Sequence, residues 1–160
     1  MITTYIGVGS NIEREKHVRV ALEELEQLGE GLRCSTIYDC AAVGFSSHSF
    51  YNLVVELKTS YSLRNLMQKL REIELKWGRE PDAQKLQDRT LDLDIILFGE
   101  QVSAACPQLP RDDIFKFAFV IQPLYELCPN RVIPQDGRTV AQIWQTHSDL
   151  DSLIAVDLFK

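Results

Sequence analysis

Strand-like and helix-like stretches alternate along residues 3–98, and their order constrains the fold more than any other feature of the sequence. Short stretches rich in apolar and β-branched residues predict strands, and longer stretches with apolar residues at helical spacing predict helices. The strands are expected over 3–9, 32–41, 50–58 and 91–98. The helices are expected over 12–28 and 62–78.

This order, strand-helix-strand-strand-helix-strand, is the split-βαβ pattern, so we expect an α+β protein with a ferredoxin-like βαββαβ core. Further helices are expected near 117–127 and 139–146, where they would decorate that core. The 160 residues contain no linker, repeat or low-complexity stretch. Because this length also suits one hydrophobic core, we expect a single domain over 1–160.

The first strand is expected to run into the first helix through a short turn. Ser10 lies three residues before Glu13, which is the spacing of a capping box, so Ser10 is expected to cap the helix. Gly9 is expected to form the tight turn before it. His17 is expected on the helix surface, and none of the histidines shows the spacing of a metal site or a catalytic triad.

Composition excludes several classes of function. A net charge of −6 argues against a general nucleic-acid binder, because phosphate neutralisation needs clustered Lys and Arg. No apolar run approaches the roughly 20 residues of a membrane helix, and no secretory signal begins the chain. The four cysteines lack the pairwise spacing of a zinc site and are expected to be free thiols. We therefore expect a cytoplasmic protein that binds neither nucleic acid nor membrane.

The sharpest local motif is Arg89-Thr90-Leu91-Asp92-Leu93-Asp94-Ile95. Alternate side chains of a strand share a face, so Asp92 and Asp94 point one way while the apolar residues between them point into a core. Two adjacent carboxylates repel each other unless a proton or a cation offsets the charge. Mg²⁺ prefers one or two carboxylates together with water and phosphate oxygens, so the pair is suited to a magnesium-bound nucleotide. The alternative is a solvated strand face that carries acids.

Two weaker features could serve the same chemistry. Arg79 and Arg89 flank a polar stretch that also holds Lys85, and such guanidinium groups can close over a polyphosphate. The alternative is a solvated charged loop. Phe50 and Asn52 share one strand face, where a ring and a carboxamide could stack on and hydrogen-bond a flat heterocycle; the alternative is core packing beside an edge polar residue.

Taken in order, these segments resemble the 6-hydroxymethyl-7,8-dihydropterin pyrophosphokinase family of folate biosynthesis. The resemblance is carried by YIGVGSNIE, SFYNLVVEL, IELKWGR, RTLDLDIILFG and FVIQPLYELCP, of which RTLDLDIILFG is the most specific. It implies a ferredoxin-like core and transfer of the β,γ-pyrophosphoryl group of ATP to the hydroxymethyl oxygen of a reduced pterin, leaving AMP.

The resemblance also implies roles for individual residues. Asp92 and Asp94 would bind two Mg²⁺ ions that bridge the ATP phosphates, and with Arg79 and Arg89 they would form the catalytic set. Phe50 and Phe119 would sandwich the pterin, and Asn52 would read its edge. The backbone near Cys40, Ala42 and Val43 would add further pterin hydrogen bonds. Nucleotide contacts would come from Glu74, Arg79, Lys85, Arg89, Arg111 and Lys116.

The chain departs from the family pattern mainly on the ATP side. A second arginine is replaced by Pro81, a loop tryptophan by Leu86, and a later nucleotide-contacting arginine by Phe117. A His-Tyr pair is replaced by Arg111 and Asp112, so Arg111 and Lys116 would have to substitute in part, and Arg and Lys are not equivalent at phosphate contacts.

We expect a monomeric enzyme whose ligands are ATP and a reduced pterin. The departures from the family pattern leave two alternatives open. One is a divergent relative that binds a pterin-like ligand with weak, altered or no transferase activity, because each lost charge-assisted contact costs about 1.5–3 kcal/mol. Another is a non-catalytic ferredoxin-like ligand-binding or interaction module.

Overall fold

The computed structural model describes residues 1–79 and 87–158. Within these residues, six strands form one sheet in which every strand pair is antiparallel. The strands are β1 (Ile2–Ser10), β2 (Glu30–Cys34), β3 (Ile37–Cys40), β4 (Phe50–Thr59), β5 (Asp92–Phe98) and β6 (Ile154–Val156). The helices are α1 (Arg14–Glu26), α2 (Leu63–Lys76), α3 (Asp113–Lys116), α4 (Ala118–Leu127), α5 (Val140–Trp144) and the short 3₁₀ turn η1 (Leu150–Ser152).

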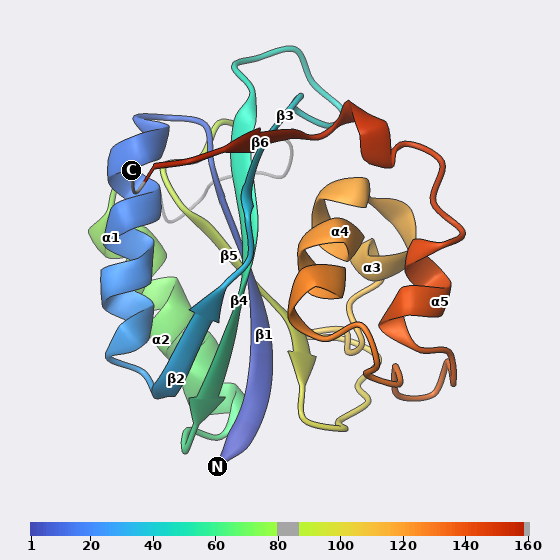
Figure 1. The fold of residues 1–160 in the computed structure, drawn as a ribbon. Helices are drawn as coiled ribbons and strands as arrows, with labels where there is room; N and C mark the ends of the chain where they lie inside the picture. Colours follow the sequence, from blue (N-terminus) through green and yellow to red (C-terminus); the bar gives the residue numbers. More distant parts are fainter. Residues whose placement is uncertain (80–86, 159–160) are drawn as a thin grey trace.

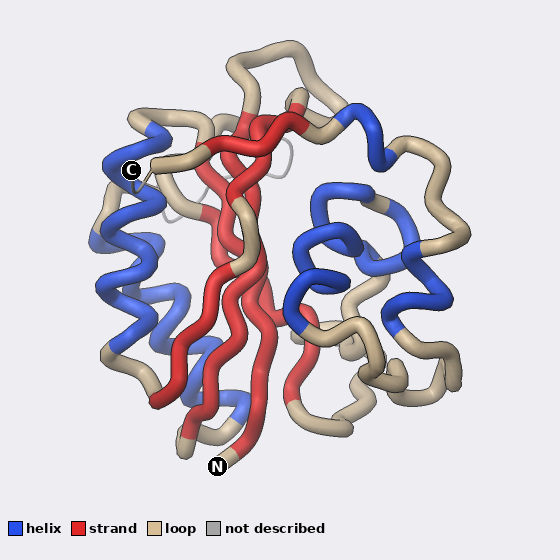
Figure 2. The backbone as a smooth tube through the Cα atoms, viewed as in Figure 1, coloured by secondary structure: helices blue, strands red, loops and turns tan. Residues whose placement is uncertain are grey.

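The sheet order is β5-β1-β4-β3-β6, and β2 also pairs with β4. Helices α1 and α2 cover one face of the sheet, while α3, α4 and α5 cover the other (Figures 1 and 2). The predicted α+β class and ferredoxin-like core are therefore confirmed, as are the additional helices near the C-terminus. No helix among the described residues is both long enough and apolar enough to cross a membrane.

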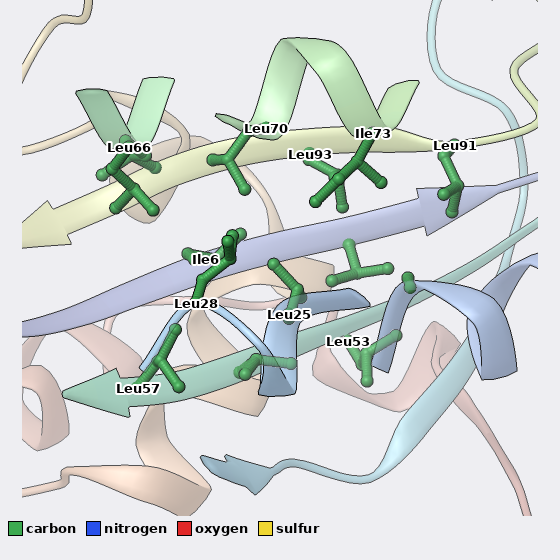
Figure 3. Packing of buried hydrophobic residues seen from close by; sticks show 14 of the residues in the cluster. Ile6, Leu25, Leu28, Leu53, Leu57, Leu66, Leu70, Ile73, Leu91 and Leu93 are labelled. Atoms are coloured by element: carbon green, nitrogen blue, oxygen red, sulfur yellow. The ribbon is translucent and has the colours of Figure 1, made fainter. Parts of the chain in front are cut away.

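The core on the α1 and α2 face is built mainly from residues of both helices and of β1, β4 and β5. Figure 3 shows Leu66, Leu70 and Ile73 of α2 turned toward Leu93 of β5. Ile6 of β1 lies beneath them and is fully buried. This packing presses α2 against β5, which is the strand that carries the two aspartates.

The core on the opposite face joins the sheet to the C-terminal helices. Its fully buried members include Ile114 of α3, Ile121 and Leu124 of α4, and Val140 of α5. They pack against Ile96 and Leu97 of β5 and Tyr5 and Val54 of the neighbouring strands. The segment that follows β5 is thereby returned over the sheet face on which Asp92 and Asp94 lie.

The predicted strand over 32–41 is wrong as one element, because the chain forms β2 and β3 with a break at Ser35 and Thr36. The Ser35 hydroxyl accepts a hydrogen bond from the Val54 amide at 2.9 Å, in place of a backbone carbonyl. The Ser35 amide still donates to the Val54 carbonyl at 2.9 Å. A side-chain acceptor thus replaces one rung of the ladder and lets the strand bend.

The predicted entry into the first helix is also wrong. The Ser10 hydroxyl bonds the Ile12 carbonyl at 3.2 Å, and Glu13 occupies the N-cap position without a side-chain cap. Gly9 lies inside β1 rather than in a turn. His17 is only 3% exposed, because its Nδ1 bonds the Ile12 carbonyl at 2.7 Å and its ring meets that of Trp77 edge-on.

Candidate active site

Asp92 and Asp94 occupy alternate positions of β5 and share the sheet face that looks toward α4. Leu91, Leu93 and Ile95 point the other way into the core under α2, as the alternation predicts. The two aspartates line a pocket of about 480 Å³, and a hollow of about 160 Å³ continues from it under Phe119. The side chains of Asp92 and Asp94 are 41% and 37% exposed, so a ligand in the pocket can reach both.

A bare strip of backbone separates the acids from the strand that carries Asn52. In the sheet register, Asp92 is opposite Gly9, and Gly9 is opposite Asn52 on its other side. Gly7 is likewise opposite Asp94. A Cβ on Gly9 would lie 3.0 Å from the Asn52 Oδ1 and 3.7 Å from the Phe50 ring. Because Gly9 has no side chain, the base of the pocket between the Asn52 carboxamide and the Asp92 carboxylate is flat; this base is called the floor below.

Aromatic rings stand at the same end of the pocket as Asn52. Phe50 of β4 and Phe119 of α4 both line it, together with Phe45 from the loop before β4. Phe45 meets Phe50 edge-on with ring centroids 6.4 Å apart. Phe117 stacks on Phe119 at 4.9 Å with the planes 17° apart. The pocket thus offers apolar rings and a carboxamide at one end, as a flat, polar-edged heterocycle requires.

Arg79 reaches the acids from the end of α2. Its Nη1 lies 2.9 Å from Glu74 Oε2 and 3.8 Å from Asp92 Oδ1. The same Glu74 oxygen accepts a hydrogen bond of 2.9 Å from the Leu93 amide, which points outward because β5 is an edge strand. Within the described residues, the Arg79 Nε is buried and has no hydrogen-bond partner. Glu74 therefore binds α2 to β5 and holds Arg79 beside Asp92.

Arg89 precedes β5 and is only 8% exposed. Its amide donates to Asn11 Oδ1 at 2.7 Å, while the Asn11 amide donates to the Arg89 carbonyl at 3.0 Å. The Asn11 side chain also donates to Asp88 at 2.7 Å and to the His48 carbonyl at 3.2 Å. Asn11 thus ties three loops together at the mouth of the pocket.

Arg111 approaches Asp94 from the segment that follows β5. Its Nη2 lies 3.6 Å from Asp94 Oδ2, and its Nε donates to Asp113 Oδ2 at 3.0 Å. Its backbone amide donates to the Ile96 carbonyl at 3.0 Å, which fixes the residue to β5. The two aspartates of the strand therefore each have a guanidinium within 4 Å.

Desolvation raises the pKa of Asp94 to about 7, and repulsion from Asp92 adds to the rise. Desolvation also raises the pKa of Asp92, against the attraction of Arg79. Desolvation likewise raises the pKa of Glu74, although the Leu93 amide and Arg79 oppose it. Burial therefore opposes ionisation of the pair in spite of the nearby guanidinium groups, and a cation placed at the pair would favour the ionised forms of both aspartates.

The donor set fits Mg²⁺. Two accessible carboxylates suit this ion, which usually keeps water and phosphate oxygens as its remaining ligands. The described residues contain no cluster of three or more side chains able to hold a metal by themselves. The rest of the coordination shell would accordingly come from water and from a phosphorylated ligand.

The structure brings most of the residues predicted from the sequence into one pocket. Those that line it are Val43, Phe50, Asn52, Glu74, Arg79, Arg89, Asp92, Asp94, Arg111 and Phe119. Cys40 is buried beside Asn52, and Ala42 is half-buried next to the lining residue Ala41. Lys116 is exposed and pairs with Asp112 at 2.6 Å instead. Lys85, Pro81 and Leu86 lie outside the described residues.

Several lining residues were not expected. Arg71 lies one helical turn before Glu74, with its Nη1 3.9 Å from that carboxylate, and the spacing along α2 is a signal that could have identified it. Phe45 is an aromatic residue in a loop of small residues, which is a weaker signal. Asp113 has no sequence signal, because its role depends on the position of Arg111.

Larger hollows lie elsewhere on the surface. One of about 740 Å³ lies between α1 and β2, and another of about 810 Å³ lies between the end of α4 and β6. Neither is lined by an aromatic ring. A third hollow, of about 550 Å³ beside α1, has only one aromatic residue, Tyr51, whose ring lies under the Arg14 guanidinium. The pocket at Asp92 is therefore the better candidate for binding a heterocycle, in spite of its smaller volume.

Comparison with known proteins gives one consistent family. The 7,8-dihydro-6-hydroxymethylpterin-pyrophosphokinase family model matches residues 5–129. The chain is 34% identical over 137 residues to the 2-amino-4-hydroxy-6-hydroxymethyldihydropteridine pyrophosphokinase of Aquifex aeolicus, covering 84% of this chain and 85% of that one. It is 36% identical over 145 residues to the protein of the same name from Pseudomonas aeruginosa, covering 87% and 88%.

Solved structures agree at the level of the fold. The HPPK-DHPS of Plasmodium falciparum superimposes with a TM-score of 0.70 at 12% sequence identity, over 91% of this chain. This chain spans 43% of that longer protein. The likeness supports the fold alone.

Proposed function

Because the chain belongs to the 7,8-dihydro-6-hydroxymethylpterin-pyrophosphokinase family, we propose that the pocket at Asp92 and Asp94 is its active site. The protein is an enzyme of folate synthesis that transfers a pyrophosphoryl group from ATP to a hydroxymethylpterin. The observation that carries the site assignment is the cross-strand row Asp92–Gly9–Asn52, which joins an acidic end of the pocket to an aromatic, amide-bearing end.

The pterin binds at the aromatic end. Phe50 and Phe119 stack on its rings, and Asn52 hydrogen-bonds its polar edge. The backbone near Cys40, Ala42 and Val43 supplies further hydrogen bonds, which is supported by the place of Val43 in the pocket lining. The bare floor at Gly9 leaves room for the substituent that points from the pterin toward the acids.

The ATP phosphates bind at the acidic end. Asp92 and Asp94 hold Mg²⁺, two ions with the nucleotide, and Arg79 and Arg89 contact the phosphate oxygens. The buried Arg79 Nε supports this role, because a phosphate oxygen would satisfy it. Arg111 adds a contact of the same kind, while Glu74 acts through Arg79. Lys116, which is exposed and pairs with Asp112, would add a weaker phosphate contact. Lys85, which lies outside the described residues, is proposed as a further nucleotide contact on the family resemblance alone.

The reaction needs a pterin alcohol to attack the β-phosphorus of ATP while the bond to the α-phosphate oxygen breaks. Mg²⁺ held by Asp92 and Asp94 would supply Lewis-acid stabilisation of the phosphate charge and would lower the pKa of the alcohol. The chain's own residues position the two substrates from opposite ends of the pocket and add positive charge where the leaving group develops. Because Asp92 would be engaged by Mg²⁺, the proton released by the alcohol passes to solvent rather than to a side chain.

The altered residues do not favour the alternative interpretations. Arg111 lies in the pocket, so a guanidinium is retained at that position even though Phe117 replaces an arginine expected from the family pattern. Phe117 instead stacks on Phe119 and extends the aromatic end. Nothing among the described residues supports a non-catalytic module or a relative without transferase activity.

We also propose that residues 1–160 act as one monomeric, cytoplasmic domain. Both hydrophobic clusters share one sheet, which supports a single folding unit. All four cysteines, which lie within the described residues, are free, as expected in a reducing compartment. Light scattering on the purified chain tests the monomer, and a mass of twice the 18.3 kDa chain would contradict it.

The site assignment is tested by measuring the two substrates separately by calorimetry. Asp94→Asn should lose binding of a non-hydrolysable ATP analogue with Mg²⁺ while it still folds and binds pterin, because its side chain faces the pocket. Asn52→Ala should lose pterin and keep the nucleotide. If each substitution weakened both ligands equally, or neither, the division of the pocket into two ends would be wrong.

A further inference from the structure

Each of the two aspartates proposed to bind metal has an arginine nearby, and that arginine lies closer to a second carboxylate than to the aspartate. Arg79 lies 3.8 Å from Asp92 but 2.9 Å from Glu74. Arg111 lies 3.6 Å from Asp94 but 3.0 Å from Asp113. Both arginines thus have an anchor that does not depend on the metal acid.

Of these two ion pairs, the one between Arg111 and Asp94 would be disturbed most by a bound cation. Asp94 is repelled by Asp92, and Arg111 is the group that offsets this repulsion most strongly. Its guanidinium supplies positive charge at the carboxylate that a divalent cation would have to reach. A cation that binds Asp94 must therefore replace an ion pair that already exists, which makes binding of the metal alone unfavourable.

We propose that Arg111, anchored by Asp113, is the counter-ion of Asp94 in the nucleotide-free enzyme and yields that carboxylate to a divalent cation when nucleotide phosphates arrive. The inference rests on the proposed function, because it takes Asp94 as a metal ligand. The Nε–Asp113 bond and the amide bond to Ile96 are both independent of Asp94, so Arg111 keeps its place after the exchange. Its terminal nitrogens then pair with phosphate oxygens, which a guanidinium binds in bidentate fashion.

The exchange makes metal and nucleotide binding mutually dependent. The metal alone has to displace Arg111 without offering it a new partner, and the nucleotide alone meets two carboxylates that repel its phosphates. Together they satisfy every group, so each ligand raises the affinity for the other. Arg111 therefore acts as a positioning residue that makes the metal site selective for the metal–nucleotide complex over the free ion.

The experiment measures the affinity for Mn²⁺, a spectroscopic substitute for Mg²⁺, by the electron paramagnetic resonance signal of the free ion. Without nucleotide, Arg111→Met should lower the Kd for Mn²⁺ at least about tenfold, because a cation is removed about 4 Å from the ligand. With Mn²⁺ present, the same variant should bind a non-hydrolysable ATP analogue more weakly. Arg138→Met is the matched control, because Arg138 pairs with Asp136 at 2.9 Å outside the pocket.

Opposite effects on the free ion and on the nucleotide would support the proposal. It is overturned if Arg111→Met leaves the Kd for Mn²⁺ unchanged, or if Arg138→Met tightens it equally. The Asp94→Asn variant distinguishes failure of the proposed metal site from failure of the counter-ion role of Arg111. If Asp94→Asn abolishes Mn²⁺ binding while Arg111→Met has no effect, only the counter-ion proposal fails; if Asp94→Asn binds Mn²⁺ normally, the proposed metal site itself is wrong.

Discussion

Glu74 accepts the Leu93 amide and the Arg79 guanidinium with the same carboxylate oxygen, each at 2.9 Å. One buried residue of α2 therefore does two things: it completes the hydrogen bonding of the edge strand β5 and fixes the arginine beside Asp92. The stability of the helix–strand contact and the geometry of the proposed phosphate site depend on the same side chain.

Glu74→Ala is expected to lower the free energy of unfolding by about 2–4 kcal/mol, because it leaves a buried amide and a buried guanidinium without their partner. Urea unfolding measures this loss. Glu72→Ala, on an exposed position of the same helix, should cost less than about 0.5 kcal/mol. Glu74→Gln should keep the Leu93 hydrogen bond and most of the stability while it weakens nucleotide binding through Arg79. Equal costs for the Glu74 and Glu72 substitutions to alanine would contradict the account.

The pKa of Asp94, raised to about 7, predicts a pH dependence of stability in the metal-free protein. Between about pH 4 and pH 7 the folded state holds a proton that the unfolded state has released, so stability falls as the pH rises through this range. Asp94→Asn removes this loss. We expect the variant to be about 1–2 kcal/mol more stable than the wild type at pH 8, after allowance for the partial exposure of the carboxyl, and equal to it near pH 4.

Asp136 supplies a control of opposite sign. The hydrogen bonds from Arg138 lower the pKa of Asp136, so its contribution to stability is present above about pH 4 and is lost as the pH falls through the folded-state pKa. Asp136→Asn should therefore destabilise the protein at pH 8. Thermal unfolding of both variants from pH 4 to pH 8 checks the signs, and a parallel response of the two would refute the assignment.

Gly9→Ala is expected to weaken pterin binding about tenfold without unfolding the protein, because the added methyl group would lie 3.0 Å from Asn52 Oδ1. The φ angle of Gly9 is not positive, so alanine is conformationally acceptable in β1. A double-mutant cycle with Asn52→Ala isolates the contact. The Gly9 substitution should have little further effect once the carboxamide is gone; full additivity would show that the methyl group acts elsewhere.

Phe119→Ala is expected to raise the Kd for pterin about tenfold or more, through the loss of a stacking surface. Phe117→Ala should have a smaller effect in the same direction, because Phe117 orients Phe119 by stacking on it at 4.9 Å. Phe115→Ala removes a ring that packs in the neighbouring core outside the pocket. Calorimetric titration with pterin should find that this control costs stability and leaves the Kd unchanged.

The fold follows from the sequence where side-chain periodicity decides which face of an element is buried. Two elements are predicted correctly in this way. The alternation around Leu53, Val55 and Leu57 predicts β4, and the stripe of apolar residues over 62–78 predicts α2. The break at Ser35 could not be predicted, because it depends on a hydroxyl that reaches the amide of a strand nineteen residues later. The prediction that His17 lies on the helix surface is wrong for a similar reason, since the Ile12 carbonyl satisfies its ring and allows burial.

The site follows from the sequence only in part. The period of a strand places Asp92 and Asp94 on one face, so the acids could be identified without a structure. The arginine anchors could not, because Glu74 and Asp113 are set against Arg79 and Arg111 by the packing of α2 and α3 around β5. The sequence predicts a turn at Gly9 because nothing in it shows that the strand continues to Ser10, as it does in the structure.

The central claim is that Asp92 and Asp94 support transfer to a pterin. It is tested most directly by AMP release from ATP and Mg²⁺, with and without 6-hydroxymethyl-7,8-dihydropterin. The account predicts AMP release that depends on the pterin, a rate at least about 100-fold lower in Asp92→Asn and Asp94→Asn, and no change in Arg138→Met. AMP release that is independent of the pterin, or wild-type rates in both aspartate variants, would contradict it.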